Sequence, residues 1–200
     1  MGAGVQQLVH EFSQGSLLKT DNPLDLAIQG DGFFKVQTQD GSIAYTRNGS
    51  FMINNKYQLV TEEGDLVLDT LDKPIVLNTV ELQMRSYNDI NITESGQIEI
   101  NHEGNKVMLQ QIAICDFQDK EFIQWNGHSK FVPQDYQYNP ELKAEKFSIQ
   151  QGSIETSNTN LVNEMIGMIN VSRGYETLSK FMKEQSTMLS TAIGVGRPNF

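Results

Sequence analysis

The chain has 200 residues, a formal net charge of −10 at pH 7 and a hydrophobic content of 38%. This length is sufficient for one or two small domains with a buried core. The acidic balance disfavours a protein that binds nucleic acid or an anionic membrane surface, because both functions need clustered Lys and Arg. Cys115 is the single cysteine, which excludes an internal disulfide and a cysteine zinc site, and we expect it to be a buried small hydrophobe.

The first residues, 1–20, are interpreted as an extended lead-in to the first domain. Their opening stretch, MGAGVQQLVHEFSQG, has no basic segment followed by an apolar one, so a cleaved signal peptide is not expected. No apolar run approaches the ~18 residues of a membrane-spanning helix, so the chain is not expected to be embedded in a membrane.

Residues 21–150 are predicted to form a β-rich domain, an antiparallel meander with irregular loops. Asp-Gly and Asn-Gly pairs recur along it and mark tight turns, because these residues tolerate positive φ. Short β-rich runs between the turns are typical of strands. The predicted strands are 33–37, 43–47, 51–53, 57–61 and 66–68, followed by 90–93, 97–101 and 106–117.

The pattern weakens in 117–138, which mixes aromatic residues with Gly and Pro. We interpret this stretch as an irregular loop that packs Trp125 and Phe131 against the sheet. Residues 144–157 are predicted to contain a further strand that leads toward the C-terminal part of the chain.

Residues 151–192 are interpreted as a linker and one long C-terminal α-helix of coiled-coil type, followed by a tail, 193–200. Ser157, Asn158 and Asn160 are candidates for the helix cap and for the joint with the β-rich domain. A helix of ~32 residues is ~48 Å long, well above the usual three turns. It either covers its own β-rich domain or contacts another helix, and its length favours the second. Large side chains recur every seven residues: Leu161, Met168, Tyr175, Met182 and Leu189.

No catalytic, cofactor-binding or metal-binding residue is predicted. The histidines His10, His102 and His128 lie in unrelated contexts, and no zinc-protease, serine-hydrolase or phosphate-loop motif is present. The Gly-Asp-Gly at 30–32 is interpreted as a turn before a strand rather than a metal or sugar site. A small-molecule substrate is therefore not expected.

Two segments resemble a specific family, the axial proteins of the bacterial flagellum, which include rod and hook proteins. The first is NPLDLAIQGDGFFKVQTQDGSIAYTRNGSF, residues 22–51, and the second is GSIETSNTNLVNEMIGMINVSRGYETLSKFMKEQSTML, residues 152–189. The second is similar to the family's C-terminal signature, a Gly-x-x-Glu-x-Ser-Asn segment that leads into a helix with an Arg-x-Tyr-Glu motif. Its matching residues are Gly152, Glu155, Ser157, Asn158, Glu164, Met165, Arg173, Tyr175 and Glu176.

This resemblance implies a structural subunit of the basal-body rod rather than an enzyme, without cofactors. Such a subunit assembles helically with copies of itself and with other axial proteins, rod and hook, encloses an export channel and passes torque to the hook. The implied location is the rod where it crosses the periplasm and cell wall, reached without a cleaved signal peptide. The length favours the distal rod protein, then its proximal paralogue, over the longer hook protein. A phage-tail-like or baseplate-like binding module and a peptidoglycan-cutting enzyme are the alternatives.

Family members usually begin with a helix that carries a Ser-Asn-Asn-Leu-Ala-Asn type motif. This chain has no such motif, so we expect the N-terminal partner helix to be absent from it. The C-terminal helix would then contact neighbouring subunits, and flexible Met side chains suit such contacts. The predicted assembly interface consists of Leu161, Met165, Met168, Arg173, Tyr175, Glu176, Leu178, Met182 and Leu189.

Overall fold

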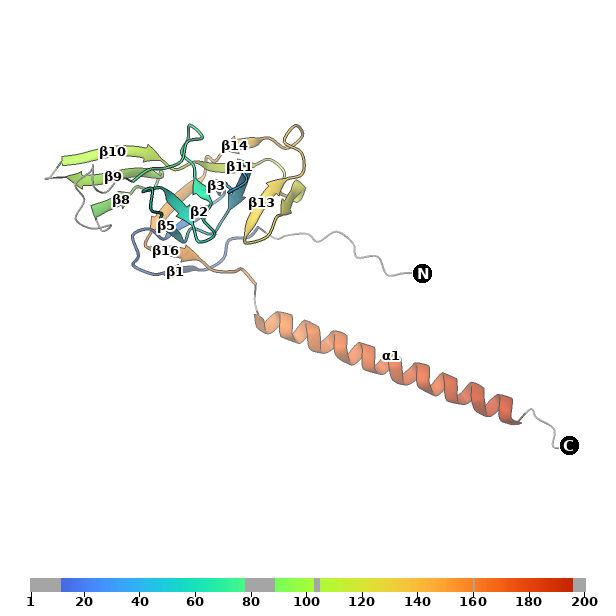
Figure 1. The fold of residues 1–200 in the computed structure, drawn as a ribbon. Coiled ribbons are helices and arrows are strands. Elements are labelled where there is room, and N and C mark those ends of the chain that lie inside the picture. The colour runs from blue at the N-terminus through green and yellow to red at the C-terminus, as the bar shows by residue number, and fades with distance from the viewer. Residues whose placement is uncertain (1–11, 78–88, 103–104, 160, 196–200) are drawn as a thin grey trace. The chain divides into compact units, whose positions relative to one another are not determined.

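The computed structural model describes residues 12–77, 89–102, 105–159 and 161–195. The chain divides between Asn158 and Thr159 into two compact units. The first is built of β-strands and the second contains one long α-helix (Figure 1). The prediction of a mainly β protein with antiparallel sheets and one C-terminal α-helix is confirmed for these residues. Residues 1–11 of the predicted lead-in, the cap candidate Asn160 and residues 196–200 of the predicted tail lie outside them.

The strands of the first unit are short and follow closely on one another along the chain. They are β1 (Leu17–Lys19), β2 (Leu26–Gly30), β3 (Phe33–Gln37), β4 (Ile43–Thr46), β5 (Phe51–Ile53), β6 (Leu59–Thr61), β7 (Leu66–Val67), β8 (Ile90–Ile92), β9 (Gln97–His102), β10 (Asn105–Gln111), β11 (Ile114–Phe117), β12 (Ile123–Trp125), β13 (Lys130–Pro133), β14 (Glu141–Lys143), β15 (Phe147–Gln151) and β16 (Ser153–Glu155). A short 3₁₀ helix, η2 (Lys120–Phe122), precedes β12.

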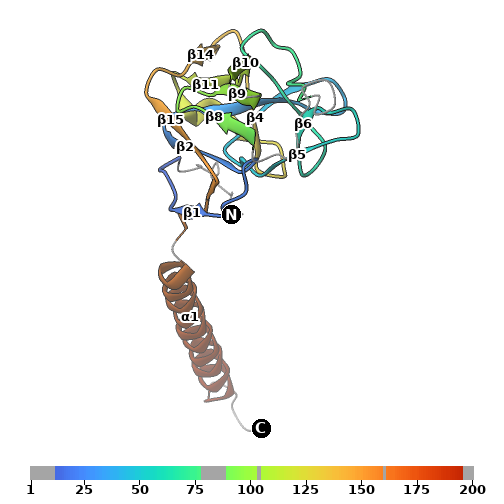
Figure 2. The ribbon, with the colours of Figure 1, turned by 90° about the vertical axis from the view of Figure 1, so that its left-hand side faces the viewer.

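All strand pairs in the described residues are antiparallel, and many join neighbours in the sequence. The pairs β3–β4, β5–β6, β6–β7, β8–β9, β9–β10 and β12–β13 are of this local kind. Others bring distant segments together: β3 pairs with β7 and β11, β4 with β13, and β11 with β14. The beginning and end of the unit meet in two further pairs, β2–β15 and β1–β16 (Figure 2).

Two details of the predicted strands were wrong. The stretch 117–138 is not an irregular loop, because it contains η2 and the hairpin β12–β13, whose turn begins at Asn126-Gly127. Phe131 packs against the core as expected, but Trp125 is 59% exposed. The predicted strand 106–117 is two strands, β10 and β11, which belong to different sheets. Tertiary pairing decided both, since β13 is held by β4 and β11 by β3.

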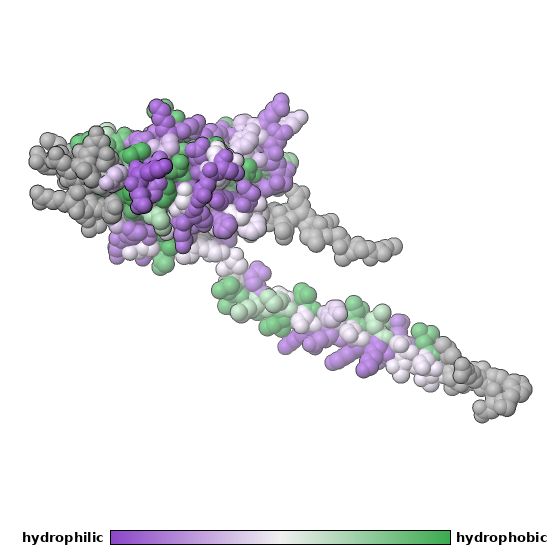
Figure 3. Space-filling view, in the orientation of Figure 1, coloured by the Kyte–Doolittle hydropathy of each residue, from purple (hydrophilic) through white to green (hydrophobic). Residues whose placement is uncertain are grey.

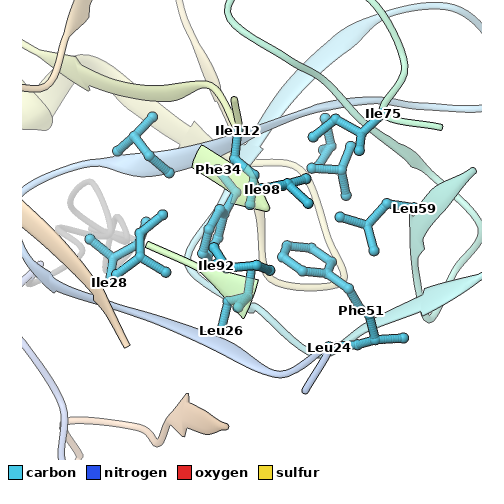
Figure 4. Close-up of a cluster of buried hydrophobic side chains, with 14 of the residues drawn as sticks. Leu24, Leu26, Ile28, Phe34, Phe51, Leu59, Ile75, Ile92, Ile98 and Ile112 are labelled. Atoms are coloured by element: carbon cyan, nitrogen blue, oxygen red, sulfur yellow. The ribbon is translucent and has the colours of Figure 1, made fainter. Parts of the chain in front are cut away.

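The core of the unit lies on both sides of β3. Phe34 and Val36 face a large cluster of buried aliphatic side chains, in which the Phe34 and Phe51 rings meet edge to face with centroids 5.0 Å apart (Figure 4). Phe33 faces a smaller cluster that includes the rings of Tyr45 and Phe117. The strand is therefore buried on both faces, which explains its run of apolar residues.

The helix α1 (Leu161–Val195) has 35 residues and a length of about 52 Å at 1.5 Å per residue. Every side chain described in it, from 161 to 191, is exposed. No helix in the described part of the chain is long and apolar enough to cross a membrane.

Candidate assembly interface and chain junction

All nine predicted interface residues lie on α1, and its apolar ones are exposed by 61–75%. An α-helix turns by about 100° per residue, so a seven-residue spacing drifts by only about 20°. Leu161, Met168, Tyr175 and Met182 therefore follow one slowly winding stripe. By the same rotation of about 100° per residue, Arg173 lies about 160° and Glu176 about 100° around the helix from Tyr175. These two charged residues therefore lie off the line of the stripe.

The two halves of α1 differ in how their apolar residues are distributed. From 161 to 171, seven large apolar side chains are exposed over an arc of about 220°, with Asn163, Gly167 and Asn170 on the remaining side and Glu164 as the only charge. From 173 to 184, the charged residues share one side and Tyr175, Leu178 and Met182 share the other, as the purple and green sides of the helix in Figure 3 show. A helix with so wide an apolar arc needs cover on more than one side, whereas a helix with a narrow apolar side needs a single partner.

A chain junction in the β-rich unit lies directly before α1 in the sequence. Its basis is β1–β16, which aligns Leu17 with Glu155 and Lys19 with Ser153. Gly152, at φ 73°, makes the turn from β15 into β16, and its carbonyl accepts hydrogen bonds from the backbone N–H groups of Thr20 (2.8 Å) and Asp21 (3.1 Å). A positive φ favours glycine at this turn. The segment that follows Gly152 is therefore held against the beginning of the unit.

Glu155 and Arg47 form the centre of this junction. Arg47 Nε donates to Glu155 Oε2 at 2.9 Å, and the backbone N–H of Gly15 donates to Glu155 Oε1 at 2.9 Å. The remaining nitrogens of Arg47 donate to the carbonyls of Gly30 (2.9 Å), Gly32 (2.8 Å) and Ile28 (3.2 Å). The side chains of Arg47 and Glu155 are 19% and 10% exposed. One ion pair thus fastens three separate segments, 12–16, 28–32 and 155–158.

The segment after Glu155 continues the contact with the beginning of the unit. Thr156 donates from its backbone N–H and its hydroxyl to the carbonyl of Ser16, both at 2.9 Å. Asn158 Nδ2 donates to the carbonyl and the hydroxyl of Ser13, both at 3.0 Å. Gly15 leaves no space for a side chain, because a Cβ there would lie 1.8 Å from the Thr156 carbonyl oxygen.

The structure describes two of the three predicted joint residues, Ser157 and Asn158. Asn158 binds the segment 12–16, and Ser157 lies beside it, while Asn160 is outside the described residues. The role of all three as helix cap or joint stays a prediction. Sequence reasoning missed Arg47 and Gly15, whose roles depend on pairing across more than 100 residues; Glu155 was noted only as a motif position.

A second group of ion pairs is centred on a buried lysine of the β-rich unit. Lys35 on β3 contacts Asp72 Oδ1 and Glu141 Oε1, both at 2.6 Å, and the Tyr45 hydroxyl donates to the other oxygen of Glu141. Burial alone would lower the pKa of Lys35, but the hydrogen bonds with Asp72 and Glu141 raise it above its ordinary value. Burial, with the nearby Glu141 charge, raises the pKa of the Cys115 thiol to about 12. Cys115 is buried as predicted and stays protonated at neutral pH, so it is a poor nucleophile.

Two regions of the chain match models of known protein families. Residues 27–100 match the family model for the flagellar hook protein FlgE/F/G D1 domain, and residues 150–195 match that for the flagellar basal body rod FlgEFG protein C-terminal region. The chain is 32% identical to the flagellar basal-body rod protein FlgG of Buchnera aphidicola subsp. Schizaphis graminum over 195 residues, which is 94% of the chain and 72% of the relative.

More distant bacteria supply similar relatives. FlgG of Borreliella burgdorferi is 32% identical over 193 residues, 93% of the chain and 69% of the relative. The rod protein FlgF of Mesorhizobium japonicum is 31% identical over 183 residues, 90% of the chain and 70% of the relative. The first matched region contains Arg47 and the second contains Glu155, so the junction joins the two.

Proposed function

Because the chain belongs to the family of flagellar basal-body rod proteins of the FlgG and FlgF type, and is a structural subunit of the bacterial flagellum, we propose that α1 is its main assembly interface. The observation that carries the proposal is the exposed apolar surface of residues 161–171, which spans about 220° of the helix circumference. Burial of a large apolar side chain stabilises by about 1.5–3 kcal/mol. Seven such side chains therefore provide about 10–20 kcal/mol for association, before the entropic costs are subtracted.

The distribution of apolar residues favours different neighbours for the two halves of α1. Residues 161–171 would be enclosed by at least two neighbouring helices, while 173–189 would contact one through Tyr175, Leu178, Met182 and Leu189. Arg173 and Glu176 would then bond to a neighbour on another side. Heterologous contacts of this kind do not close into a ring, and they generate a helical assembly.

We further propose that the partners are copies of the chain and other flagellar axial proteins, rod and hook. The assembly would enclose an export channel and transmit torque to the hook, in the rod that crosses the periplasm and cell wall. Export without a cleaved signal peptide, the absence of a cofactor and the absence of enzymatic activity belong to the same proposal. Membership of a family of rod proteins leaves less support for a phage-tail-like binding module or a peptidoglycan-cutting enzyme.

Two matched substitutions in the full chain test the α1 interface. Leu178→Gln changes the apolar side of the second half, and Lys180→Gln changes its charged side with the same new residue. Gln is a good helix former, so the intrinsic helix propensity is nearly conserved in both variants. Sedimentation velocity over a range of concentrations should show about tenfold or weaker association for Leu178→Gln and little change for Lys180→Gln.

Equal association of Leu178→Gln and Lys180→Gln would contradict the proposal. So would strong protection of the amides of 161–189 from hydrogen exchange in a dilute monomer. Most of the stability of a helix in a protein comes from packing of its apolar face rather than from intrinsic propensity, so such protection would mean that the chain itself covers α1.

A further inference from the structure

A second exposed surface lies in the β-rich unit and is distinct from the proposed interface on α1. Residues 117–143, here called the aromatic segment, run from the end of β11 to the end of β14 and include η2, β12 and β13. Phe122, Trp125, Tyr136 and Tyr138 are exposed by 46–86%. Among the described residues, these are the exposed large aromatic side chains of the unit. Aromatic residues are enriched in protein interfaces and supply much of their binding energy.

The position of β12 makes both sides of the aromatic segment accessible. β12 is the outermost strand in the order β12-β13-β4-β3-β7-β6-β5, and no other described strand pairs with its outer edge. Phe122 and Tyr138 border a hollow of 660 Å³, whereas Trp125 borders a separate hollow of 520 Å³. Protruding rings beside hollows can interdigitate with the surface of another protein.

The turn of the β12–β13 hairpin is held in an unusual conformation. His128 and Ser129 have φ values of 47° and 56°, and for residues other than glycine this left-handed region costs about 1–2 kcal/mol each. The turn is fixed by the bond from Asn126 N–H to the Lys130 carbonyl (2.8 Å) and by the Thr46 hydroxyl, which donates to the Ser129 carbonyl at 2.8 Å. Strain of this kind clusters at sites with a binding role. A prearranged surface also loses less entropy when it binds.

Charge indicates which partner this surface fits. Residues 1–158 hold 11 Lys and Arg against 22 Asp and Glu, a net charge of −11, but the aromatic segment has three lysines and four carboxylates, a net charge of −1. Within it, Lys120 bonds to the exposed Asp31 at 2.7 Å and Lys130 to the buried Asp65 at 2.5 Å, which neutralises two neighbouring acidic groups. Two copies of such an acidic unit repel each other least where the local charge is smallest.

We propose that the aromatic segment is a contact surface for the β-rich unit of a second copy of this chain. The surface goes beyond the α1 interface and does not depend on it. The aromatic segment also lies outside both regions that match family models, 27–100 and 150–195.

Trp125 provides a direct test, because it is the only tryptophan of the chain. In the dilute full chain we expect emission typical of an exposed indole and efficient quenching by acrylamide. At concentrations where sedimentation velocity shows association, the emission should shift to shorter wavelength and the quenching should decrease. Tyr138→Ser and Phe122→Ser should each weaken association about tenfold or more. Met52→Ser, at an exposed site on β5 at the other end of the sheet, is the matched control and should leave association unchanged.

The outcomes separate this surface from the α1 interface. A shift of Trp125 emission that persists in Leu178→Gln supports the aromatic contact even if the α1 proposal fails. Association without any change of Trp125 emission, or without sensitivity to Tyr138→Ser, overturns the aromatic contact and leaves the α1 proposal intact. An indole already shielded in the dilute chain, a change that appears only when a different axial protein is added, or no association at any concentration also overturns it.

Discussion

Replacement of Glu155 by Gln should loosen the chain junction that precedes α1. In the native chain, one carboxylate oxygen accepts from Arg47 Nε and the other from the Gly15 N–H, each at 2.9 Å. A Gln side chain is nearly the same size, but it has only one acceptor oxygen. Its NH₂ group would face one of these two donors, so that donor would lose its partner.

The magnitude follows from burial and from the bonds that survive. Removal of one partner from a fully buried ion pair costs about 3–5 kcal/mol. Arg47 and Glu155 are 19% and 10% exposed, and Arg47 keeps its bonds to the carbonyls of Gly30, Gly32 and Ile28. These remaining acceptors compensate part of the charge, so we expect Glu155→Gln to lower the free energy of unfolding of the β-rich unit by about 2–3 kcal/mol.

Urea unfolding monitored by near-UV circular dichroism measures this change, because the closely packed rings of Phe33, Tyr45 and Phe117 lie in the core of the same unit. Glu145→Gln is the matched control: it removes the same charge from an exposed side chain and should change stability by less than about 0.5 kcal/mol. Arg47→Met and the double variant complete a cycle that isolates the coupling between the two residues. If Glu155→Gln unfolds at the same urea concentration as Glu145→Gln, or if the coupling is zero, the junction is not held by this ion pair.

Three other substitutions test further features. Gly15→Ala should destabilise the β-rich unit by about 1–3 kcal/mol, since the new Cβ would overlap the Thr156 carbonyl; urea unfolding with a stability equal to the native chain would contradict the close approach. Gly174→Ala should raise the helix content seen by circular dichroism, because no atom lies within 4 Å of a Cβ there and alanine favours an exposed helix by about 1 kcal/mol; unchanged or lower helicity would argue against a helix at this site. Asp69→Asn should cost about 1–2 kcal/mol at pH 7, since its carboxylate accepts from the backbone N–H groups of Leu71 and Lys73 and from Gln110. Burial alone would raise the pKa of Asp69, but these bonds hold it below the ordinary 3.8, so the stabilisation is complete above about pH 4 and lost as the pH falls through the lowered pKa. The difference between native chain and Asp69→Asn should therefore narrow in acid; a constant difference from pH 7 to pH 2 would refute this account.

Local signals predicted most of the first half of the β-rich unit. Asp40-Gly41 and Asn54-Asn55 mark real turns, and the strands beside them, β3 to β6, lie within two residues of their predicted positions. Such turns form between neighbours in the sequence, so the residues that make them are adjacent and recognisable. The hairpin β12–β13 had the same signal at Asn126-Gly127, but two further residues with positive φ, His128 and Ser129, follow it, and two such residues in succession are uncommon outside glycine.

The candidate interface on α1 was also accessible from the sequence, because a helix places its residues by spacing alone. The same spacing places Arg173 about 160° and Glu176 about 100° around the helix from Tyr175, off the line of the apolar stripe. The aromatic segment was not predicted. Its exposure depends on the position of β12 at the edge of a sheet. The order of the strands in a sheet cannot be read from the sequence of any single strand.

The sequence by itself therefore determined the local properties: a β-rich unit, a long helix with an apolar stripe, and a C-terminal signature. Tertiary structure alone decided how distant segments meet. Glu155 occupies a motif position in the sequence, yet only the antiparallel pair β1–β16 brings it to Gly15, and only the turn after β4 brings it to Arg47. The physical reason is that turns and helices depend on interactions between near neighbours. A junction across more than 100 residues depends instead on the folding of the whole unit. The entropy lost when such distant segments are brought together is offset by the side chains buried throughout the unit.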